Sequence, residues 1–393
     1  MSSNQMPSNK RILFISHNAS RTGAPIVLMH HLAALKRLYP DIVFDILLKD
    51  GGDLVNKFMA LAPTSVLPKL TVIDRLAKRI FKQSDPALQT VRRIIGNAKY
   101  KVIYGNTVLT ADLLAIAKQN NPNATTICHV HELEFAIKQI FGEKHFADAI
   151  PFIDHFVATS NAVKDMLITV YKIPENRIYV YHGHIPMPDN INTPVKINND
   201  LIDSLKKSNL NICGSGAIGW TKGIDLFIQA AHALHQSNPN DNFHFYWIGG
   251  SKSDIEYEKA IYDIRKAGIA HRVTMVENNP DPQYYMQLCD IFFLSSREDS
   301  FPLVCLEAAA LGKPIICFAG SGGMVEFVDD DSGWLINYFD FIKLNNVLKN
   351  LLEDSNRQEV ILKKGLVAKS KVAPYDIEKG IIEFKSYLDG KFN

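Results

Sequence analysis

The chain has 393 residues, enough for two domains that each bury a core of their own. Its composition, 47% hydrophobic and 21% charged, is that of a globular protein. Its formal net charge of +2 gives no general attraction to membranes or to nucleic acid but excludes neither, and we expect no nucleic-acid partner. No apolar run approaches the ~20 residues of a membrane span and the polar start MSSNQMPSNKR is unlike a signal peptide, which predicts a cytoplasmic protein.

The first part of the chain alternates strand-like and helix-like segments. The strand-like ones are RILFIS (11–16), DIVFDILL (41–48), KVIYGN (101–106), TTICHVHE (125–132), HFVATS (155–160) and RIYVY (177–181). The helix-like ones are PIVLMHHLAALKRLY (25–39), ADLLAIAK (111–118) and AVKDMLITVY (162–171). This alternation predicts a doubly wound α/β domain over residues 1–185.

A stretch rich in Pro, Asn and Asp then predicts a linker over residues 186–207. The alternation restarts in NLNICGSG (209–216), FHFYWIGG (243–250), RVTMVEN (272–278), IFFLSS (291–296), PIICFAG (314–320) and WLIN (334–337), with helical patterns between them. We therefore predict a second, similar domain over 208–375, joined to the first by a hinge. Residues 340–393 have a helical pattern, and the last segment, 376–393, is expected to return to the first domain.

The five cysteines are odd in number, scattered and mostly inside apolar segments: Cys128, Cys213, Cys289, Cys305 and Cys317. Without a CxxC pair, this pattern predicts buried free thiols in a reducing compartment.

One predicted helix carries an isolated acid. In REDSFPLVCLEAAALGKP (297–314), Ser300 is a plausible N-cap, Pro302 suits the first turn, and Gly312 predicts the stop. The neighbours of Glu307 at 304, 306, 308, 310 and 311 are all apolar. A carboxylate in such surroundings needs partners, and ligand hydroxyl groups are suitable ones, although an exposed helix position would also explain it. The preceding loop lies beyond a strand's carboxyl end, where α/β sheets bind ligands.

The residues of this loop and helix resemble retaining glycosyltransferases of family 4, which have the GT-B fold. The family carries two acids separated by seven positions, matched here by Asp299 and Glu307, with Glu298 as an alternative first acid. GWTKGIDLFIQAA resembles the family's phosphate-binding loop through Lys222 and Gly223. The resemblance covers most of the chain and is strongest from 211 to 335. It implies two Rossmann-like domains facing across a cleft.

The resemblance also implies roles for individual residues. Glu307 would hold the ribose of a nucleotide sugar, Asp299 would contact the sugar, and the backbone N–H groups of Phe301 and of Leu303, the neighbour of Pro302, would face the sugar and the diphosphate. The physics agrees, since a helix N-terminus favours an anion, and a cation such as Lys222 stabilises a departing diphosphate. The family usually has an Arg where this chain has Ala217, so Arg297 or Arg21 is a candidate substitute.

Further resemblances lie in the first domain. Gly23 and Ala24 resemble a loop whose backbone approaches the donor phosphate. His131, in CHVHELE, resembles the histidine that meets the transferred sugar; because His129 shares its face in a strand, a metal site and a structural role are alternatives. The remaining candidates for the acceptor pocket are Asn106, Glu132, Ser160, Gly322, Gly323 and Glu326. Asp329, Asp330 and Asp331 are explained by a solvated turn, and no metal or other cofactor is required.

The segment 69–101 has nine Lys or Arg and two Asp. Around Lys78, Arg79 and Lys82 an apolar helical face is flanked by positive charge, which suggests a segment that rests on an anionic membrane. An ordinary amphipathic helix packed on its domain is the alternative.

These patterns predict a transferase that moves a sugar from a nucleoside diphosphate sugar to a saccharide or lipid-linked acceptor, in bacterial surface polysaccharide or glycolipid assembly on the inner face of the plasma membrane. Two alternatives keep the fold, namely a nucleotide-sugar epimerase and a non-catalytic sugar-binding subunit. A third follows from GSGAIG (214–219), which fits the dinucleotide pattern G-x-G-x-x-G. It is disfavoured because WTKG precedes the helical pattern and because no acid ends the next strand.

Overall fold

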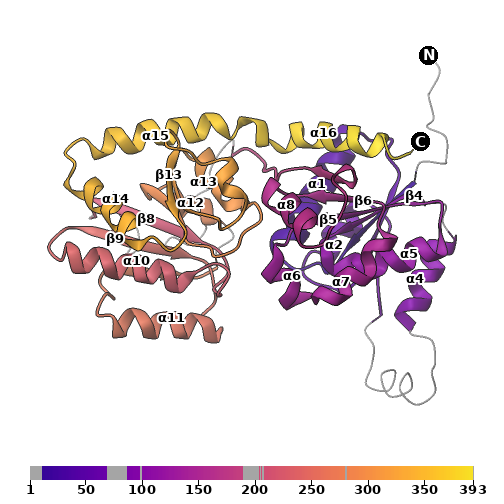
Figure 1. The fold of residues 1–393 in the computed structure, drawn as a ribbon, viewed down its shortest axis with the longest axis horizontal. Coiled ribbons are helices and arrows are strands. Elements are labelled where there is room, and N and C mark those ends of the chain that lie inside the picture. The colour runs from indigo at the N-terminus through magenta and orange to yellow at the C-terminus, as the bar shows by residue number, and fades with distance from the viewer. Residues whose placement is uncertain are drawn as a thin grey trace. The chain divides into compact units, whose positions relative to one another are not determined.

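The computed structural model describes residues 11–68, 86–97, 100–188, 203, 205, 208–278 and 281–392. The chain divides into two compact units, the first made of Met1–His184 and Ile377–Asn393, the second of Ile185–Asp376. The last segment of the chain thus belongs to the first unit, where helix α16 (Ile377–Asp389) lies beside α1 (Gly23–Leu38) (Figure 1).

The described part of the first unit contains a parallel sheet of seven strands in the order β3-β2-β1-β4-β5-β6-β7. The strands are β1 Arg11–Ser16, β2 Phe44–Leu48, β3 Thr64–Val66, β4 Tyr100–Asn106, β5 Thr125–Val130, β6 His155–Ala158 and β7 Ile178–Val180. The other helices are α2 Val55–Leu61, α4 Pro86–Asn97, α5 Ala111–Asn120, α6 Glu134–Ile140, α7 Glu143–Ala149 and α8 Asn161–Thr169.

The described part of the second unit contains a parallel sheet of six strands in the order β10-β9-β8-β11-β12-β13. These are β8 Leu210–Ser215, β9 Phe243–Ile248, β10 Val273–Val276, β11 Ile291–Leu294, β12 Ile315–Ala319 and β13 Gly333–Asn337. The helices are α10 Ile224–Ser237, α11 Ile255–Lys266, α12 Pro282–Met286, α13 Leu303–Ala310, α14 Phe341–Glu353 and α15 Arg357–Lys371.

Both sheets are covered by helices on each face, as their continuous apolar strands require. Side chains alternate across β1, so that Leu13 and Ile15 pack with α4, α5, α7 and α8, while Ile12 and Phe14 pack with α1, α2 and α16. In the second unit, α10, α11 and α14 cover one face and α12, α13 and α15 the other. The predicted doubly wound α/β architecture is confirmed.

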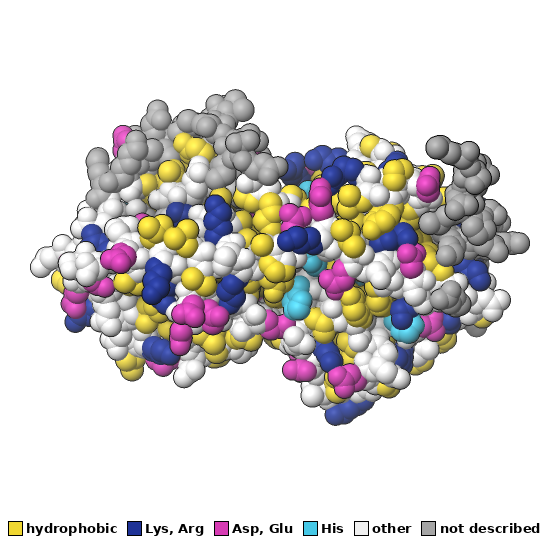
Figure 2. Space-filling view, turned by 90° about the horizontal axis from the view of Figure 1, so that it is seen from above, with side chains coloured by type: hydrophobic (Ala, Val, Ile, Leu, Met, Phe, Trp, Pro, Cys, Tyr) yellow, Lys and Arg dark blue, Asp and Glu magenta, His cyan; other side chains and the backbone are white. Residues whose placement is uncertain are grey.

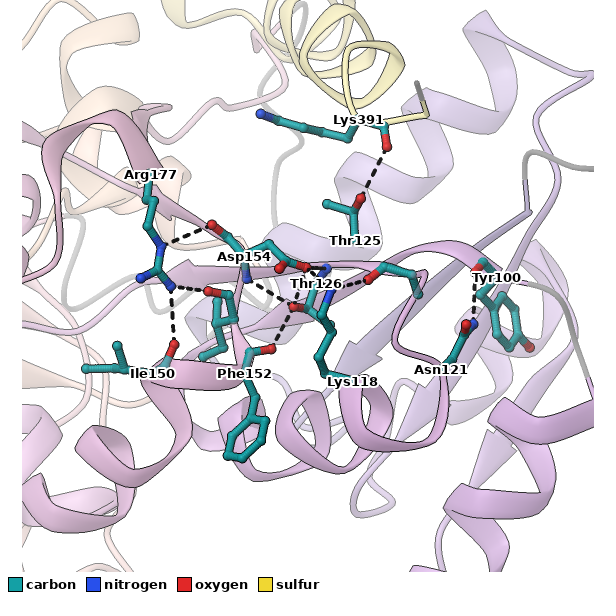
Figure 3. Close-up of polar contacts among 12 residues, drawn as sticks. Tyr100, Lys118, Asn121, Thr125, Thr126, Ile150, Phe152, Asp154, Arg177 and Lys391 are labelled. Carbon is teal, nitrogen blue, oxygen red and sulfur yellow. Dashed lines mark hydrogen bonds and ion pairs between the residues drawn. The ribbon is translucent and has the colours of Figure 1, made fainter.

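The amino-terminal edge of the first sheet is held by a polar network centred on Asp154 (Figure 3). The Asp154 carboxylate accepts hydrogen bonds from Lys118 Nζ at 2.7 Å and from the backbone N–H of Thr126 at 2.8 Å. At this same edge the Asn121 side chain donates to the backbone carbonyl of Tyr100 at 3.1 Å. The network joins α5 to the starts of β5 and β6, opposite the edge where parallel sheets bind ligands.

All five cysteines are free and buried, as predicted. No helix in the described ranges is both long and apolar enough to cross a membrane. On the face seen in Figure 2, acidic and basic side chains are interspersed over each unit, in keeping with the small net charge. Residues 69–85, which carry the proposed membrane-binding helix, lie outside the described part of the chain.

Candidate active site

The second unit brings Lys222 and Asp299 together at the carboxyl edge of its sheet. Their loops follow β8 and β11, the neighbouring strands between which the strand order reverses, and such reversal points are where α/β sheets bind ligands. The Nζ atom of Lys222 lies 2.5 Å from Asp299 Oδ2, which also accepts a hydrogen bond from Ser296 Oγ at 3.3 Å. The Asp299 side chain is only 10% exposed, so the lysine balances an acid that is largely out of water.

A tight approach between two loops fixes the position of Lys222. The next residue, Gly223, has φ +66°, and a Cβ atom there would lie 2.1 Å from the backbone oxygen of Ser295. Ser295 in turn donates from Oγ to the carbonyl of Lys222 at 3.0 Å. Only glycine permits both the left-handed backbone and this contact.

The backbone of Asp299 is held by the loop after β12. Its N–H donates to the carbonyl of Ser321 at 2.7 Å, and its carbonyl accepts from the N–H of Gly323 at 3.2 Å. Asp299 and Gly322 thereby form an isolated parallel bridge. The candidate glycines 322 and 323 therefore act in the structure by holding the acid loop in place.

Glu307 lies on α13, half-buried among the apolar residues that pack this helix onto the sheet. Burial raises the pKa of Glu307 to about 7, against the opposing effect of a hydrogen bond with Gln283. The interpretation of Glu307 as a solvent-exposed helix residue is thus wrong. An acid held at this pKa gains from partners that donate hydrogen bonds to its charged form.

The predicted start of this helix is wrong by two residues. Helix α13 begins at Leu303, with Pro302 as the N-cap instead of Ser300, and no side chain caps it. A tertiary contact explains the difference. The carbonyl of Ser300 accepts a hydrogen bond from the N–H of Gly323 at 3.1 Å, and this bond keeps the chain extended at Ser300. The N–H groups of Leu303 and Val304 therefore belong to the helix's first turn, which has no intrahelical acceptors for them.

Arg297 has a partner that the sequence did not reveal. Its guanidinium makes a bidentate pair with Asp225, at 2.8 and 2.6 Å, donates to the carbonyl of Trp220 at 2.9 Å and lies over the Trp220 ring. Its side chain is 9% exposed. In this conformation the guanidinium ties the lysine loop to the acid loop and is not available as the phosphate ligand that Ala217 lacks.

The first unit brings Ala24, Asn106 and His131 together at the carboxyl edge of β1, β4 and β5. Asn106 Nδ2 donates to the carbonyl of Ala24 at 2.9 Å, and Asn106 Oδ1 lies 2.9 Å from His131 Nε2. Burial lowers the pKa of His131 to about 3, assisted by His31 and His17. Gly23 begins α1, and no atom would lie within 4 Å of a Cβ added to it.

Two other candidates in this unit have local structural roles. Glu132 is buried and accepts the N–H groups of His131 and Val108 at 2.9 and 3.3 Å; burial raises its pKa to about 7 despite these bonds. Ser160 is fully buried and caps α8 by accepting the N–H of Val163 at 3.3 Å.

The rings of His129 and His131 are in contact, with centroids 3.9 Å apart and an angle of 42° between their planes. Among the described residues no group of three or more His, Cys, Asp or Glu side chains could hold a metal ion. His129 Nδ1 instead lies 2.7 Å from the hydroxyl of Tyr104. The described geometry therefore gives no third ligand for the metal-site alternative.

The last candidates lie in turns. Glu326 ends a short 3-10 helix, η4 (Gly323–Glu326). Asp329 closes its predicted turn by accepting from Ser332, and its pKa falls to about 2 because of bonds from Lys371 and Ser332.

The dinucleotide interpretation of GSGAIG is contradicted by the loop that follows β8. Gly219 lies in this loop, several residues before α10 begins at Ile224. The third glycine is thus not in the opening helix, where that fingerprint needs it.

Sequence analysis missed Ser296 and Gln283, which contact the two acids, and Asp225, which holds Arg297. Ser296 had a detectable signal, since it is a polar residue that directly follows an apolar strand at the carboxyl edge. No pattern in the sequence pointed to Gln283 or Asp225, because the residues that they contact are distant in sequence.

The fold and these two clusters define a two-unit nucleotide-fold protein, and comparison with known families agrees. Residues 200–366 match the family of glycosyl transferases group 1, and residues 61–186 match Glycosyltransferase Family 4. The two matches together span most of the chain, which belongs to the group 1 glycosyltransferases.

Individual relatives are similar over parts of the chain. The D-inositol 3-phosphate glycosyltransferase of Corynebacterium diphtheriae is 29% identical over 149 residues, 37% of this chain and 35% of that relative. An uncharacterized glycosyltransferase of Haemophilus influenzae is 27% identical over 184 residues, 47% of this chain and 50% of that relative. The chain thus spans half or less of the length of these relatives.

The fold is shared over nearly the whole chain with HepE of Anabaena, solved in complex with UDP. The TM-score is 0.75 at 19% identity, and the alignment covers 97% of this chain and 100% of HepE. This likeness shows the two-domain GT-B fold.

Proposed function

We propose that the protein is a retaining glycosyltransferase that moves a sugar from a nucleoside diphosphate sugar to an acceptor hydroxyl. The observation that carries the proposal is the Lys222–Asp299 pair, 2.5 Å apart at the point where the strand order reverses. A cation, an acid and the start of α13 meet there on neighbouring loops. Together they suit a ligand with both an anionic and a hydroxyl-rich part.

The second unit would bind the donor. The Glu307 carboxylate accepts the two ribose hydroxyls, which replace the water that burial removes and favour its charged form. The diphosphate lies against the N–H groups at the start of α13 and against Lys222, whose ion pair with Asp299 loosens as the phosphate charge arrives. Asp299 then accepts a hydrogen bond from the sugar.

Transfer breaks the bond between the sugar's anomeric carbon and the diphosphate oxygen, which takes the electron pair. Lys222 stabilises this developing charge, and the sugar passes through a state resembling an oxocarbenium ion. The acceptor hydroxyl forms the new bond on the same face of the sugar and gives its proton to the departing diphosphate oxygen. The described residues place no side chain as a covalent nucleophile, so we propose a single displacement with retention.

Two relatives support the choice of donor and process. HepE has been solved with UDP and with UDP-glucose, and the outer core galactosyltransferase WaaB of lipopolysaccharide shares the fold at a TM-score of 0.74 and 14% identity. We propose a uridine diphosphate sugar as the first donor to test, and a surface polysaccharide or glycolipid as the acceptor.

The test is a thermal-shift panel of nucleoside diphosphate sugars, followed by mass spectrometry of products formed with saccharide and lipid-linked acceptors. We expect one donor to stabilise the protein and to yield a product with one added sugar, whose anomeric configuration is read by NMR. Stabilisation by no donor would refute the proposal. Conversion of the donor without an acceptor would instead indicate an epimerase.

A second candidate, a subunit that binds the donor without turning it over, is favoured by one observation. Position 217 is Ala, and the nearby Arg297 is paired with Asp225. The variant Ala217→Arg separates the two cases. A silent subunit would show no product across the whole acceptor panel, and Ala217→Arg would then create turnover.

A further inference from the structure

Arg297 holds the chain on both sides of Lys222. On one side, its guanidinium donates to the backbone carbonyl of Trp220 at 2.9 Å. On the other side, it makes the bidentate pair with Asp225, in the first turn of α10, at 2.8 and 2.6 Å. Between these contacts, the backbone N–H of Arg297 donates to the carbonyl of Thr221 at 2.8 Å. One residue of the acid loop thus restrains the lysine loop at three points.

The guanidinium of Arg297 is itself fixed by packing. Its central carbon lies 5.0 Å from the centre of the Trp220 ring and 5.8 Å from the centre of the Phe339 ring. Aromatic faces attract a cation, and a bidentate pair with a carboxylate also fixes the plane of the guanidinium. Phe339 lies in the loop between β13 and α14. The loops after β8, β11 and β13 therefore all contact this one group.

Phe339 has a backbone conformation that bulky residues rarely adopt. Its φ is +62°, in the left-handed region where glycine and asparagine are usual. Such a conformation persists only where the surrounding contacts hold it. Here the Phe339 ring is stacked with Phe318, with centroids 6.5 Å apart, and meets the Tyr338 ring edge-on at 4.5 Å. These contacts keep the ring beside Arg297 in spite of the strained backbone.

We propose that Arg297 is a positioning residue that keeps Lys222 where it meets the diphosphate, and that Asp225 and Phe339 hold Arg297 for this task. This inference rests on the proposed glycosyl transfer. The guanidinium needs no contact with the donor, because its Nη1 and Nη2 atoms already bond to Asp225 and Trp220. Loss of Asp225 therefore loosens Lys222 and weakens the site. A phosphate-binding Arg297 would instead be released by the same change and would strengthen donor binding.

The first test needs no ligand. Asp225→Ala removes the partner of the guanidinium at a side chain that is 51% exposed, so the variant should fold. We expect amide hydrogen exchange in residues 295–299, read by mass spectrometry, to become about tenfold faster or more, because the backbone hydrogen bond of Arg297 opens more often. The matched control is Glu353→Ala, which removes another exposed acid of the second unit from an ion pair, with Lys349 at 3.7 Å. It should leave this exchange unchanged.

The second test measures the affinity for uridine diphosphate by calorimetry. We expect Asp225→Ala and Arg297→Lys each to lower it about tenfold, since lysine keeps the charge but cannot form the bidentate pair. When combined with Lys222→Ala, Asp225→Ala should lower the affinity no further, because Arg297 acts through Lys222. A merely structural role would add its own loss to that of Lys222→Ala. Turnover in the transfer assay should follow the same pattern.

Three results would each overturn the proposal: unchanged hydrogen exchange in Asp225→Ala, an unchanged or higher affinity for uridine diphosphate in that variant, or a further loss of affinity when Asp225→Ala is combined with Lys222→Ala. Should Arg297→Lys fail to fold, Asp225→Ala still decides, because its side chain lies at the surface. Because the exchange measurement needs no substrate, a failure of the proposed transfer activity is seen separately, as the absence of product from the unsubstituted protein.

Discussion

Replacing Glu307 by Gln should make the protein more stable and less able to bind its donor. Burial raises the pKa of Glu307 from an ordinary 4.5 to about 7. A raised pKa means that the folded state holds the proton more tightly than the unfolded chain. The stability that Glu307 contributes is therefore complete below pH 4.5 and is lost as the pH rises through 7.

The size of this loss follows from the shift. Each pKa unit corresponds to ~1.4 kcal/mol, so a shift of about 2.5 units is a loss of ~3 kcal/mol at most by pH 8. Gln keeps the shape of the side chain but cannot ionise. The free energy of unfolding of Glu307→Gln should therefore exceed that of the unsubstituted protein by up to ~3 kcal/mol at pH 8 and by almost nothing at pH 4.5.

Tryptophan fluorescence during urea unfolding is a suitable assay. The chain has three tryptophans, Trp220, Trp247 and Trp334, and all belong to the second unit with Glu307. The control is Glu258→Gln, which removes the same charge from an exposed position on α11 and should change the stability at neither pH.

A gain that is equal at both pH values, or no gain, would refute the assignment of Glu307 as an acid that folding buries without a full set of partners. In the same samples, the affinity for the nucleotide sugar should fall at least tenfold in Glu307→Gln, because an amide accepts only one of the two ribose hydroxyls well. Stability and binding should thus change in opposite directions.

Other substitutions test the remaining parts of the site. Lys222→Ala should lower turnover ~100-fold. It should also weaken donor binding, because the unpaired Asp299 carboxylate then repels the diphosphate, and calorimetry should show that adding Asp299→Asn recovers part of the lost affinity. Additive losses of affinity in the double variant would contradict the pairing of Lys222 with Asp299. Gly223→Ala should destabilise the second unit by ~2–4 kcal/mol because its Cβ would meet a backbone oxygen at 2.1 Å. Gly219→Ala, in the same unit and with no atom within 4 Å of the added Cβ, should leave the urea midpoint of the tryptophan signal unchanged, and equal effects of the two substitutions would count against this account. Burial alone would raise the pKa of Asp154, but hydrogen bonds from Lys118 and Thr126 outweigh it and leave the pKa below its ordinary value. Asp154→Asn should therefore lower the free energy of unfolding by ~1–2 kcal/mol at pH 7, and this loss should disappear as the pH falls below 4. Turnover should be unchanged. Unfolding followed by circular dichroism at pH 7 and at a pH below 4 measures this loss of stability. A loss that persists at the lower pH would contradict the role given to the Asp154 carboxylate.

The fold was predictable because both sheets are parallel and buried. Their strands are continuous apolar runs such as IFFLSS and PIICFAG, which alternate with amphipathic helices. Local chemistry also predicted the helix stop at Gly312, which has φ +72°. It failed at Ser300, because pairing of this loop with the loop after β12 keeps the chain extended where local preference would cap a helix.

Within the site, the sequence predicted residue types but not partners. The pairing of Lys222 with Asp299 and the link from Asn106 to His131 join residues that are far apart in sequence. The bidentate pair between Arg297 and Asp225 also joins residues that are far apart in sequence. Because of this pair, the Arg297 guanidinium is not available to replace the arginine that the family usually has at position 217. Such contacts depend on how the carboxyl ends of neighbouring strands meet, and a local pattern does not contain that information.

The central claim is that the carboxyl edge of the second sheet holds a nucleoside diphosphate sugar by its ribose and its diphosphate. A crystal structure of the complete chain with an unreactive analogue of a uridine diphosphate sugar tests it most directly. We predict both ribose hydroxyls within hydrogen-bond distance of the Glu307 carboxylate, and a phosphate oxygen at Lys222. An analogue bound elsewhere, with the Lys222–Asp299 pair undisturbed, would contradict the account.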